Sequence, residues 1–328
     1  MKLFVNRKPD NSGGPGVFVE KFITAIKKEG VEIQFDNYKG CDSALLLISS
    51  QGLIPKLKEQ GIRVVGRTSG FYIPDYWNGT KGRVMTPDKL AHNEELTREI
   101  PQYDHFIYQS HWAKQMYDQY LVKRDNDYSI IHNGVDLTRF KPRKKDWEGL
   151  RLLVVGNLRY LHSVDIPTKI AKLVREKYDN VTITFVGNAD PTCSKYLQKE
   201  KGKFIKCRGH IKNKDLPKIY QSHDILIHAR SGDVCPNAVA EALACGLPCV
   251  VSSWGGTREL TNIGGKACSE QNNWEYSEEF ISRSVSAVLE IIEDLDRYKK
   301  KARKTAEENL SVERMIRFYM RALFPKKK

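Results

Sequence analysis

The chain has 328 residues, 40% hydrophobic and 29% charged, a composition typical of a globular protein and long enough for two domains. No apolar run reaches about 18 residues, and charged residues interrupt the start of the chain from Arg7 onward, so we expect neither a membrane span nor a signal peptide, and a cytoplasmic location. The net charge is +14, with 23 Lys/Arg against 17 Asp/Glu in residues 1–145 and 31 against 23 in residues 146–328. An excess spread along the whole chain favours an anionic partner, which is a phosphorylated substrate, a membrane surface or nucleic acid.

Short apolar segments in the first part of the chain alternate with helical patterns. Alternation at this spacing predicts a parallel sheet with helices on both faces, which is a Rossmann-like unit. The strands are expected at residues 3–6, 44–48, 63–65, 105–108 and 128–131, and the helices at 17–28, 55–59, 88–99 and 110–121.

A glycine-rich turn, Asp10–Gly16 (DNSGGPG), follows the first expected strand. A strand, a glycine loop and a helix form a place where the backbone can approach a phosphate closely, although an ordinary turn fits the same residues. A second segment, Phe71–Arg83 (FYIPDYWNGTKGR), is a long loop rich in aromatic residues and glycine. Long loops often carry function, so we expect ligand contacts there.

The segment His132–Asp136 (HNGVD) begins with a tight-turn Asn-Gly pair, and Pro142 stiffens the chain after it. We therefore expect the domain boundary near residues 140–150. Beyond it the alternation repeats and predicts a second Rossmann-like unit. Its strands are expected at residues 152–155, 181–186, 204–207, 225–228 and 249–252, with helices at 164–177 and 214–222 and a helical end at 280–295, 298–310 and 311–324.

The most informative stretch runs from Ser231 to Glu259, where Asp233 and Glu241 are separated by seven residues. Pro236 suits a first helical turn, so we expect a helix from about Cys235–Asn237. The amides of Asn237, Ala238 and Val239 then point out of its N-terminus, where the macrodipole favours a phosphate. The two acids stand up to ~12 Å apart along such a helix, a gap that a nucleoside diphosphate sugar bridges. The alternative is an amphipathic helix that packs its apolar face into a core, with two solvated acids.

Two further features bear on this stretch. Gly255 and Gly256 permit a tight turn from strand to helix that brings amides near the phosphates. The seven cysteines show neither CxxC spacing nor the density of a disulfide scaffold, so we expect reduced and mostly buried thiols and no metal. A zinc site at Cys235, Cys245 and Cys249 is the alternative, but no His or Cys partner stands at a suitable spacing.

The stretch resembles the donor-site signature of the family 4 retaining glycosyltransferases (glycosyl transferases group 1), in which an acid, seven residues and Glu precede Ala, a small residue and Gly-Leu-Pro. Asp233 stands where the family usually has Glu. The Asn-Gly-Val-Asp segment is a second family marker. The resemblance implies the α/β architecture called GT-B, in which two Rossmann-like domains face a cleft and a C-terminal helix returns to the first domain. It also implies that Asp233 contacts the transferred sugar and Glu241 the ribose hydroxyls.

The resemblance implies a division of labour between the domains. We expect residues 1–145, with the C-terminal helix 311–328, to bind the acceptor, partly through the Phe71–Arg83 loop, and residues 146–310 to bind the donor.

The resemblance also implies further donor contacts. Gly13 and Gly14 match a loop that faces the donor, and His210 follows a strand where family members contact the base. The family's usual Arg and Lys are missing after Gly156, because Asn157 and His162 stand in their places. We expect Arg159 to take a catalytic phosphate role from a shifted loop, and His162 to donate a hydrogen bond to the phosphates. The full expected set is Asp233, Glu241 and Arg159 as catalytic residues, and Gly13, Gly14, His162, His210, Pro236, Asn237, Ala238, Val239 and Gly256 as donor-binding residues.

The implied activity is metal-independent hexosyl transfer, with retention, from a nucleotide-diphosphate sugar to an acceptor hydroxyl in cell-surface glycan or glycolipid synthesis. The basic surface suggests peripheral contact with an anionic membrane. One alternative is a nucleotide-sugar-binding protein with slow or no turnover, because the family's phosphate-binding cations are displaced. A second is a glycosyltransferase that acts on modified DNA bases. A third, a nucleic-acid-binding protein, is disfavoured because the chain has no basic helix or aromatic stacking motif.

Overall fold

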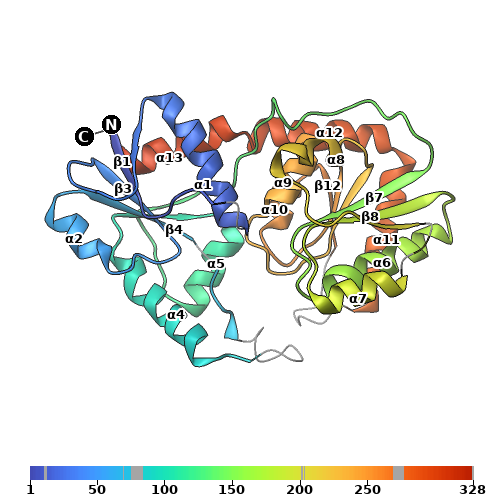
Figure 1. Cartoon of the computed structure of the whole chain (residues 1–328), viewed down its shortest axis with the longest axis horizontal. Helices are drawn as coiled ribbons and strands as arrows, with labels where there is room; N and C mark the ends of the chain where they lie inside the picture. The colour runs from blue at the N-terminus through green and yellow to red at the C-terminus, as the bar shows by residue number, and fades with distance from the viewer. Residues whose placement is uncertain are drawn as a thin grey trace. The chain divides into compact units, whose positions relative to one another are not determined.

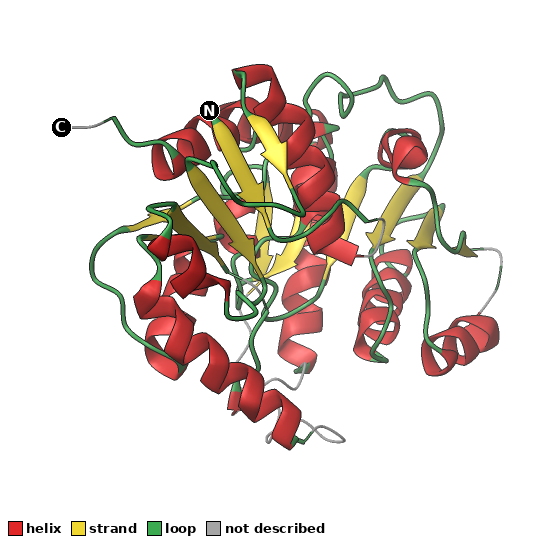
Figure 2. Cartoon of the chain, turned by 60° about the vertical axis from the view of Figure 1, so that its left-hand side comes forward, coloured by secondary structure: helices red, strands yellow, loops and turns green. Residues whose placement is uncertain are grey.

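Two six-stranded parallel sheets organise the computed structural model, which describes residues 1–10, 13–68, 70–74, 84–200, 202, 204–268 and 277–326 (Figure 1). The sheets belong to separate units. The first unit comprises Met1–Gly134 and Val312–Lys328, and the second comprises Val135–Ser311. Helices flank the strands of each sheet (Figure 2). The predicted class, α/β with two Rossmann-like domains, is therefore confirmed.

The first sheet has the strand order β2-β1-β3-β4-β5-β6, and every neighbouring pair is parallel. Its side chains alternate between two cores. Leu3 and Val5 pack with α1 and α13, whereas Phe4 packs on the other face with α2, α4 and α5. Both faces are thus covered, as the period-2 alternation of a buried strand requires. The elements are β1 (Lys2–Val5), α1 (Gly13–Ile26), β2 (Glu32–Gln34), β3 (Ser43–Leu47), α2 (Leu53–Glu59), β4 (Arg63–Arg67), α4 (Pro87–Glu99), β5 (His105–Tyr108), α5 (His111–Tyr120), β6 (Tyr128–Ile130) and α13 (Val312–Leu323), with 3-10 turns at Lys27–Glu29 and Ile100–Gln102.

The C-terminal helix α13 packs in the core of the first unit. Tyr319 is buried beside the ring of Phe22 at 5.0 Å between centroids, and its hydroxyl accepts a 3.0 Å hydrogen bond from Arg67 Nε. The amide of Gly134 donates to Met315 Sδ at 3.1 Å, so the end of the first chain segment is bound to the same helix. The expected return of the C-terminal helix to the first domain is confirmed.

The second sheet has the strand order β12-β11-β10-β7-β8-β9, again parallel throughout. Leu152 and Val154 pack on the face covered by α6, α7 and α11, and Leu153 packs on the face covered by α9 and α12. The elements are β7 (Leu150–Val155), α6 (His162–Arg175), β8 (Val181–Val186), α7 (Pro191–Glu200), β9 (Ile205–Cys207), α8 (Leu216–Tyr220), β10 (Ile225–His228), α9 (Asn237–Ala244), β11 (Cys249–Ser252), α10 (Thr257–Thr261), β12 (Gly265–Cys268), α11 (Glu278–Glu293) and α12 (Leu295–Asn309), with a 3-10 turn at Asn213–Asp215.

The division between the units falls at Gly134, within the HNGVD segment, rather than at residues 145–146. Val135 and Phe140 are buried in a core of the second unit, which assigns the chain after Gly134 to that unit. Val135 N donates to Leu310 O at 2.7 Å, so the two chain segments that connect the units are paired with each other.

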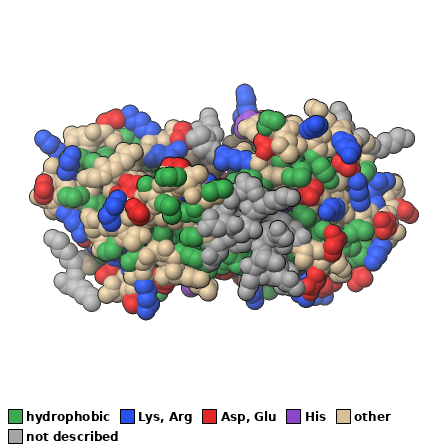
Figure 3. Space-filling model, turned by 90° about the horizontal axis from the view of Figure 1, so that it is seen from below, with side chains coloured by type: hydrophobic (Ala, Val, Ile, Leu, Met, Phe, Trp, Pro, Cys, Tyr) green, Lys and Arg blue, Asp and Glu red, His purple; other side chains and the backbone are tan. Residues whose placement is uncertain are grey.

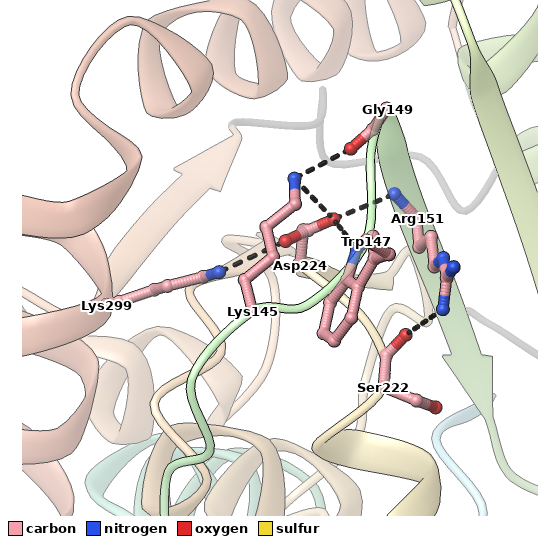
Figure 4. Close-up of polar contacts among 7 residues, drawn as sticks. All are labelled: Lys145, Trp147, Gly149, Arg151, Ser222, Asp224 and Lys299. Atoms are coloured by element: carbon pink, nitrogen blue, oxygen red, sulfur yellow. Dashed lines mark hydrogen bonds and ion pairs between the residues drawn. The ribbon is translucent and has the colours of Figure 1, made fainter.

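Asp224 anchors the edge of the second sheet where the strands begin (Figure 4). Its side chain is fully buried, and Oδ2 accepts hydrogen bonds of 3.0 Å from both Trp147 Nε1 and the Arg151 amide. Lys299 Nζ lies 3.0 Å from Oδ1, and Lys145 Nζ lies 3.5 Å from Oδ2. One carboxylate therefore joins the segment before β7, the start of β10 and helix α12.

Four elements differ from expectation. The structure adds β2, β12 and α7, and α1 begins at Gly13, so most of the expected glycine turn is helical. Pro15 needs no amide partner in a first helical turn. Gly16 lies so close to Asp10 that a Cβ would stand 2.1 Å from the Asp10 carbonyl oxygen, which only glycine permits.

Surface charge and cysteines complete the picture of the described residues. On the face in Figure 3, basic and acidic side chains are interspersed. Among the described helices, none has the length and apolarity needed to cross a membrane. None of the seven cysteines forms a disulfide, and Cys207 is exposed while the others are buried.

Candidate active site

The candidate site is built on the carboxyl end of β10 and the loop that leads to α9. Strand β10 pairs with β11 on one side and with β7 on the other. The helix α9 begins at Asn237, as expected, and Pro236 is its N-cap with φ −70° and ψ 126°, one position before the first turn. Asn237 and Ala238 are half-buried and Val239 is buried, so the helix N-terminus is partly open.

Backbone hydrogen bonds tie the Asp233 loop to the loop after β11. Gly256 N donates to Asp233 O at 2.9 Å, and Gly232 N donates to Trp254 O at 2.8 Å. Gly255 has φ +141°, and a Cβ there would lie 2.9 Å from Asp233 O, so the contact requires glycine. The Gly256 amide thus holds Asp233 in place; its expected approach to a phosphate stays a prediction.

The Asp233 carboxylate is 22% exposed, and its Oδ2 lies 3.5 Å from His228 Nε2. Burial acts to raise the pKa of Asp233, but the contact with His228 and the positive charge of Arg230 outweigh it and hold that pKa below its ordinary value. The carboxylate is therefore an ionised acceptor with part of its surface open to a ligand.

Glu241 lies in the second turn of α9 and is 6% exposed. Its Oε2 accepts a 2.9 Å hydrogen bond from the hydroxyl of Tyr220 at the end of α8. Burial, followed by the neighbouring Glu241 charge, raises the pKa of Tyr220 well above its ordinary value, so the phenol keeps its proton and remains a donor. Glu241 is thus held by a second helix rather than standing as a solvated acid.

The loop after β7 lies beside the Asp233 loop, because β7 and β10 are neighbours. Gly156 has φ +144°, which turns the chain sharply at the strand end. Arg159 is exposed, and His162 is the first residue of α6 and stacks on Tyr160 with 5.5 Å between ring centroids. The predicted cation Arg159 is therefore free to meet a ligand from solvent, whereas His162 sits at the start of a helix.

The remaining predicted residues lie in two places. His210 is exposed and follows Gly209, whose carbonyl accepts a 2.7 Å hydrogen bond from Gly187 at the end of β8. Gly13 and Gly14 begin α1 in the first unit, and Gly14 has open space where a Cβ would stand. Most of the Phe71–Arg83 loop is outside the described residues; Phe71 itself packs on Tyr117 of α5 at 4.8 Å between ring centroids.

The topology of the second sheet brings most of the predicted residues to one edge. The carboxyl ends of parallel strands share an edge of their sheet, so the loops bearing Arg159, His210, Asp233 and Gly256 gather there, outside the strands. Within the described ranges, no group of three or more His, Cys, Asp or Glu side chains is placed to hold a metal ion.

Three residues near the predicted acids were absent from the sequence prediction. His228 ends β10, Arg230 lies in the loop after it, and Tyr220 lies in the helix before it. A histidine that ends an apolar strand five residues before an acid was the available signal for His228, and an arginine three residues before the same acid was the signal for Arg230. Nothing in the sequence pairs Tyr220 with Glu241.

Comparison with known proteins decides the family. Residues 149–294 match the family model described as "Glycosyl transferases group 1". The second unit is a glycosyl transferases group 1 domain. The family prediction made from the Asp233–Glu241 stretch is therefore confirmed for this part of the chain.

Two curated relatives match part of the chain. Spore coat protein SA of Bacillus subtilis (strain 168) is 25% identical over 214 residues, which cover 56% of this chain and 55% of the relative. Alpha-monoglucosyldiacylglycerol synthase of Acholeplasma laidlawii is 24% identical over 158 residues, or 42% of this chain and 39% of the relative. The chain thus aligns with about half of one relative and less of the other.

Solved structures extend the likeness to both units. Anabaena Alr3699/HepE in complex with UDP has a TM-score of 0.74 at 14% identity, covering 98% of this chain and 99% of that chain. The same protein in complex with UDP-glucose has a TM-score of 0.72 with the same coverage. At this identity the likeness establishes the fold alone, and it confirms the GT-B assignment.

Proposed function

We propose that this glycosyl transferases group 1 protein transfers a hexose, with retention, from a nucleoside diphosphate sugar to an acceptor hydroxyl. The bond between the anomeric carbon and the diphosphate oxygen breaks, and the diphosphate keeps the electron pair. The acceptor oxygen forms the new bond to the anomeric carbon, and its proton goes to the departing diphosphate.

The observation that carries this proposal is the state of Asp233. Its carboxylate is ionised, partly exposed, and fixed through its backbone at the edge of the sheet where the loops gather. A fixed carboxylate beside the anomeric carbon stabilises the positive charge that develops on the sugar ring in the transition state. We assign Asp233 this role, and Glu241 the ribose hydroxyls.

The departing diphosphate carries negative charge, so it needs hydrogen-bond donors and positive charges around it. The partly open N-terminus of α9, at Asn237 and Ala238, offers backbone amides aligned with the helix dipole. Exposed Arg159 adds a full positive charge from the neighbouring loop, and His162 and His210 border the same edge. We assign the amides and Arg159 to the departing diphosphate, His162 to a supporting hydrogen bond and His210 to the base.

We further propose UDP as the nucleotide and a cell-surface glycan or glycolipid as the acceptor, with the reaction in the cytoplasm. Support for UDP comes from HepE, whose structures hold UDP and UDP-glucose. Support for the acceptor class comes from the relatives named for a spore coat and for a glucosyldiacylglycerol. The donor is assigned to the second unit and the acceptor to the first.

The test is an Asp233→Asn variant assayed for release of UDP from UDP-glucose. We expect turnover to fall by about 10²- to 10³-fold, because a transition-state charge partner is lost, while UDP affinity stays within about twofold. Asp296→Asn, which changes an exposed acid on α12, is the matched control and keeps full activity. Undiminished turnover in Asp233→Asn would show the assignment to be wrong.

A binding protein without turnover is the second candidate, because the loop after Gly156 carries Asn157 and His162 where the family has cations. The same assay separates the two. Wild-type protein that binds UDP-glucose by calorimetry but releases no UDP, with or without a mixture of glycan and glycolipid acceptors, supports the binding protein.

A further inference from the structure

His228 is the last residue of β10 and faces the Asp233 carboxylate across the strand end. The imidazole is 9% exposed, and its Nε2 is buried without a hydrogen bond of normal geometry to any described residue. The nearest acceptor is Asp233 Oδ2 at 3.5 Å, beyond the usual N–H···O range of about 2.7–3.2 Å. A buried polar atom in this state needs an explanation, because such atoms are normally satisfied.

Hydrogen bonds fix the backbone around His228 and Asp233, so only movement of the side chains can change the distance between Nε2 and Oδ2. Strand β10 is held between β7 and β11, and the Asp233 carbonyl is bound by Gly256 N at 2.9 Å. A rotation of the Asp233 side chain therefore changes its distance to His228 without moving the loop. Catalytic hydrogen bonds that are long in a free enzyme commonly shorten when the substrate binds.

We propose that His228 is a positioning residue, whose Nε2–H holds one oxygen of Asp233 so that the other oxygen meets the transferred sugar. The proposal rests on the function proposed above, because it gives a second residue to the same carboxylate. Donor binding brings Nε2 and Oδ2 to hydrogen-bond distance. Both the neutral Nε2–H tautomer and the imidazolium supply the required donor, so the role does not depend on a charged ring.

Three substitutions distinguish positioning from packing. His228→Leu fills the volume of the imidazole with an apolar side chain that has no hydrogen-bond donor. In His228→Asn, the side-chain amide reaches only as far as the position of the histidine Nδ1. His228→Gln carries an N–H to about the depth of Nε2. If His228 only packs, Leu is tolerated at least as well as Gln, because the site is buried.

The measurement is the kcat for UDP release from UDP-glucose, together with the Kd for UDP by calorimetry. We expect kcat to fall about 10- to 100-fold in His228→Leu and His228→Asn, and to stay within about threefold of wild type in His228→Gln. The Kd for UDP stays unchanged in all three, because the proposal assigns the pair to the sugar and not to the nucleotide, and an unchanged Kd also reports that each variant is folded. A parallel loss of UDP affinity and kcat, or Gln no better than Leu, overturns the proposal; should Leu fail to fold, the Asn and Gln pair gives the same comparison.

A double-mutant cycle separates this proposal from the one on which it rests. If His228 acts through Asp233, adding His228→Leu to Asp233→Asn costs little beyond Asp233→Asn alone. Additive losses contradict the positioning role and leave the transferase proposal standing. Full turnover in Asp233→Asn contradicts the transferase proposal itself, whatever the His228 variants do.

Discussion

Two aspartates bracket strand β10, and they differ in nearly every physical respect. Asp224 precedes the strand and is completely buried, and hydrogen-bond donors and ammonium groups surround both of its oxygens at 3.0–3.5 Å (Figure 4). Asp233 follows the strand and keeps 22% of its side chain exposed; its carboxylate lies 3.5 Å from His228 Nε2 and accepts a backbone hydrogen bond from Cys235. The same residue type thus occupies a fully buried site at one edge of the sheet and a partly exposed site at the other.

This difference in burial and partners separates acids that stabilise the fold from acids that we propose to bind a ligand. A buried carboxylate is tolerated only when donors and charges compensate its lost hydration, and Asp224 meets that requirement within the protein. Asp233 lies at the carboxyl edge of the strands, where ligands bind in open parallel sheets, and we propose that its exposed part meets a ligand. We therefore expect substitutions at Asp224 to change stability and substitutions at Asp233 to change turnover.

Asp224→Ala provides the largest test of this separation. The change leaves the ammonium groups of Lys145 and Lys299 and the indole N–H of Trp147 without their carboxylate, and we expect a loss of about 3–5 kcal/mol in the free energy of unfolding. Asp233→Ala, the matched control, should cost less than about 1 kcal/mol. Urea unfolding followed by circular dichroism gives both values, and equal losses would remove the distinction.

His223, next to Asp224, adds a pH test at the same edge. Burial lowers its pKa from 6.5 to about 4, and the ring contacts Ile219 O at 2.7 Å and Thr184 Oγ1 at 2.9 Å. The unfolded chain takes up the proton first as the pH falls, so this group lowers the unfolding free energy between about pH 6.5 and 4, on the order of 3 kcal/mol in all.

The variant His223→Gln should flatten that dependence in urea unfolding measured at several pH values. His105 in the first unit has its pKa lowered by burial, also to about 4, and contributes with the same sign, so only the difference between variant and wild type is informative. A variant curve as steep as that of wild type would show that His223 takes up its proton in the folded state as readily as in the unfolded chain.

The apolar central strands of both sheets and the edge strands β6 and β9 could be predicted from the sequence, and the edge strands β2 and β12 could not. The expected strands at 105–108, 181–186, 225–228 and 249–252 have the observed bounds. Strands β2 (EIQ) and β12 (GKAC) lie at sheet edges, where one neighbour suffices and the sequence needs no apolar run. Helix α7 buries only Cys193 and Leu197, too few apolar residues to show a helical period.

The candidate active site also has features that could be predicted from the sequence and features that could not. Local features such as Pro236, the start of α9 and the glycines after β11 follow from turn and helix chemistry within a few residues. Contacts that depend on tertiary packing, such as Tyr220 with Glu241 and the Asp233 carbonyl with Gly256, join different elements and have no sequence pattern. Family resemblance supplied the acids, but only the folded chain reveals what holds them.

Tyr220→Phe tests Glu241, which shares one property with each aspartate. Glu241 is nearly buried, as Asp224 is, yet it is assigned to a ligand, the ribose, as Asp233 is assigned to the sugar. Loss of the 2.9 Å hydrogen bond should cost about 1.5–3 kcal/mol in unfolding free energy, since the bond is to a charged acceptor, and should weaken UDP binding by up to roughly tenfold. Calorimetry and urea unfolding read the two effects, and a stability loss with unchanged UDP affinity would place Glu241 with Asp224 as a structural acid.

The smallest expected effect belongs to Arg230, an exposed residue whose charge helps to lower the pKa of Asp233. Turnover that needs the ionised carboxylate is lost as the pH falls through that pKa. Arg230→Ala should therefore move the acid limb of the pH profile for UDP release to higher pH. Arg297→Ala, on the exposed face of α12, is the control and leaves the limb in place.

Salt sharpens the Arg230 experiment, because the guanidinium is exposed and its field is screened within about 3 Å at 1 M ionic strength. High salt should move the acid limb of wild type toward that of Arg230→Ala and leave the variant almost unchanged. The contact with His228 is shielded from solvent, so it persists in salt and keeps part of the lowering of the Asp233 pKa. If high salt moved the acid limbs of wild type and Arg230→Ala equally, the net positive charge of the whole chain, and not Arg230, would lower the pKa of Asp233. Asp233 and Asp224 would then differ in burial alone.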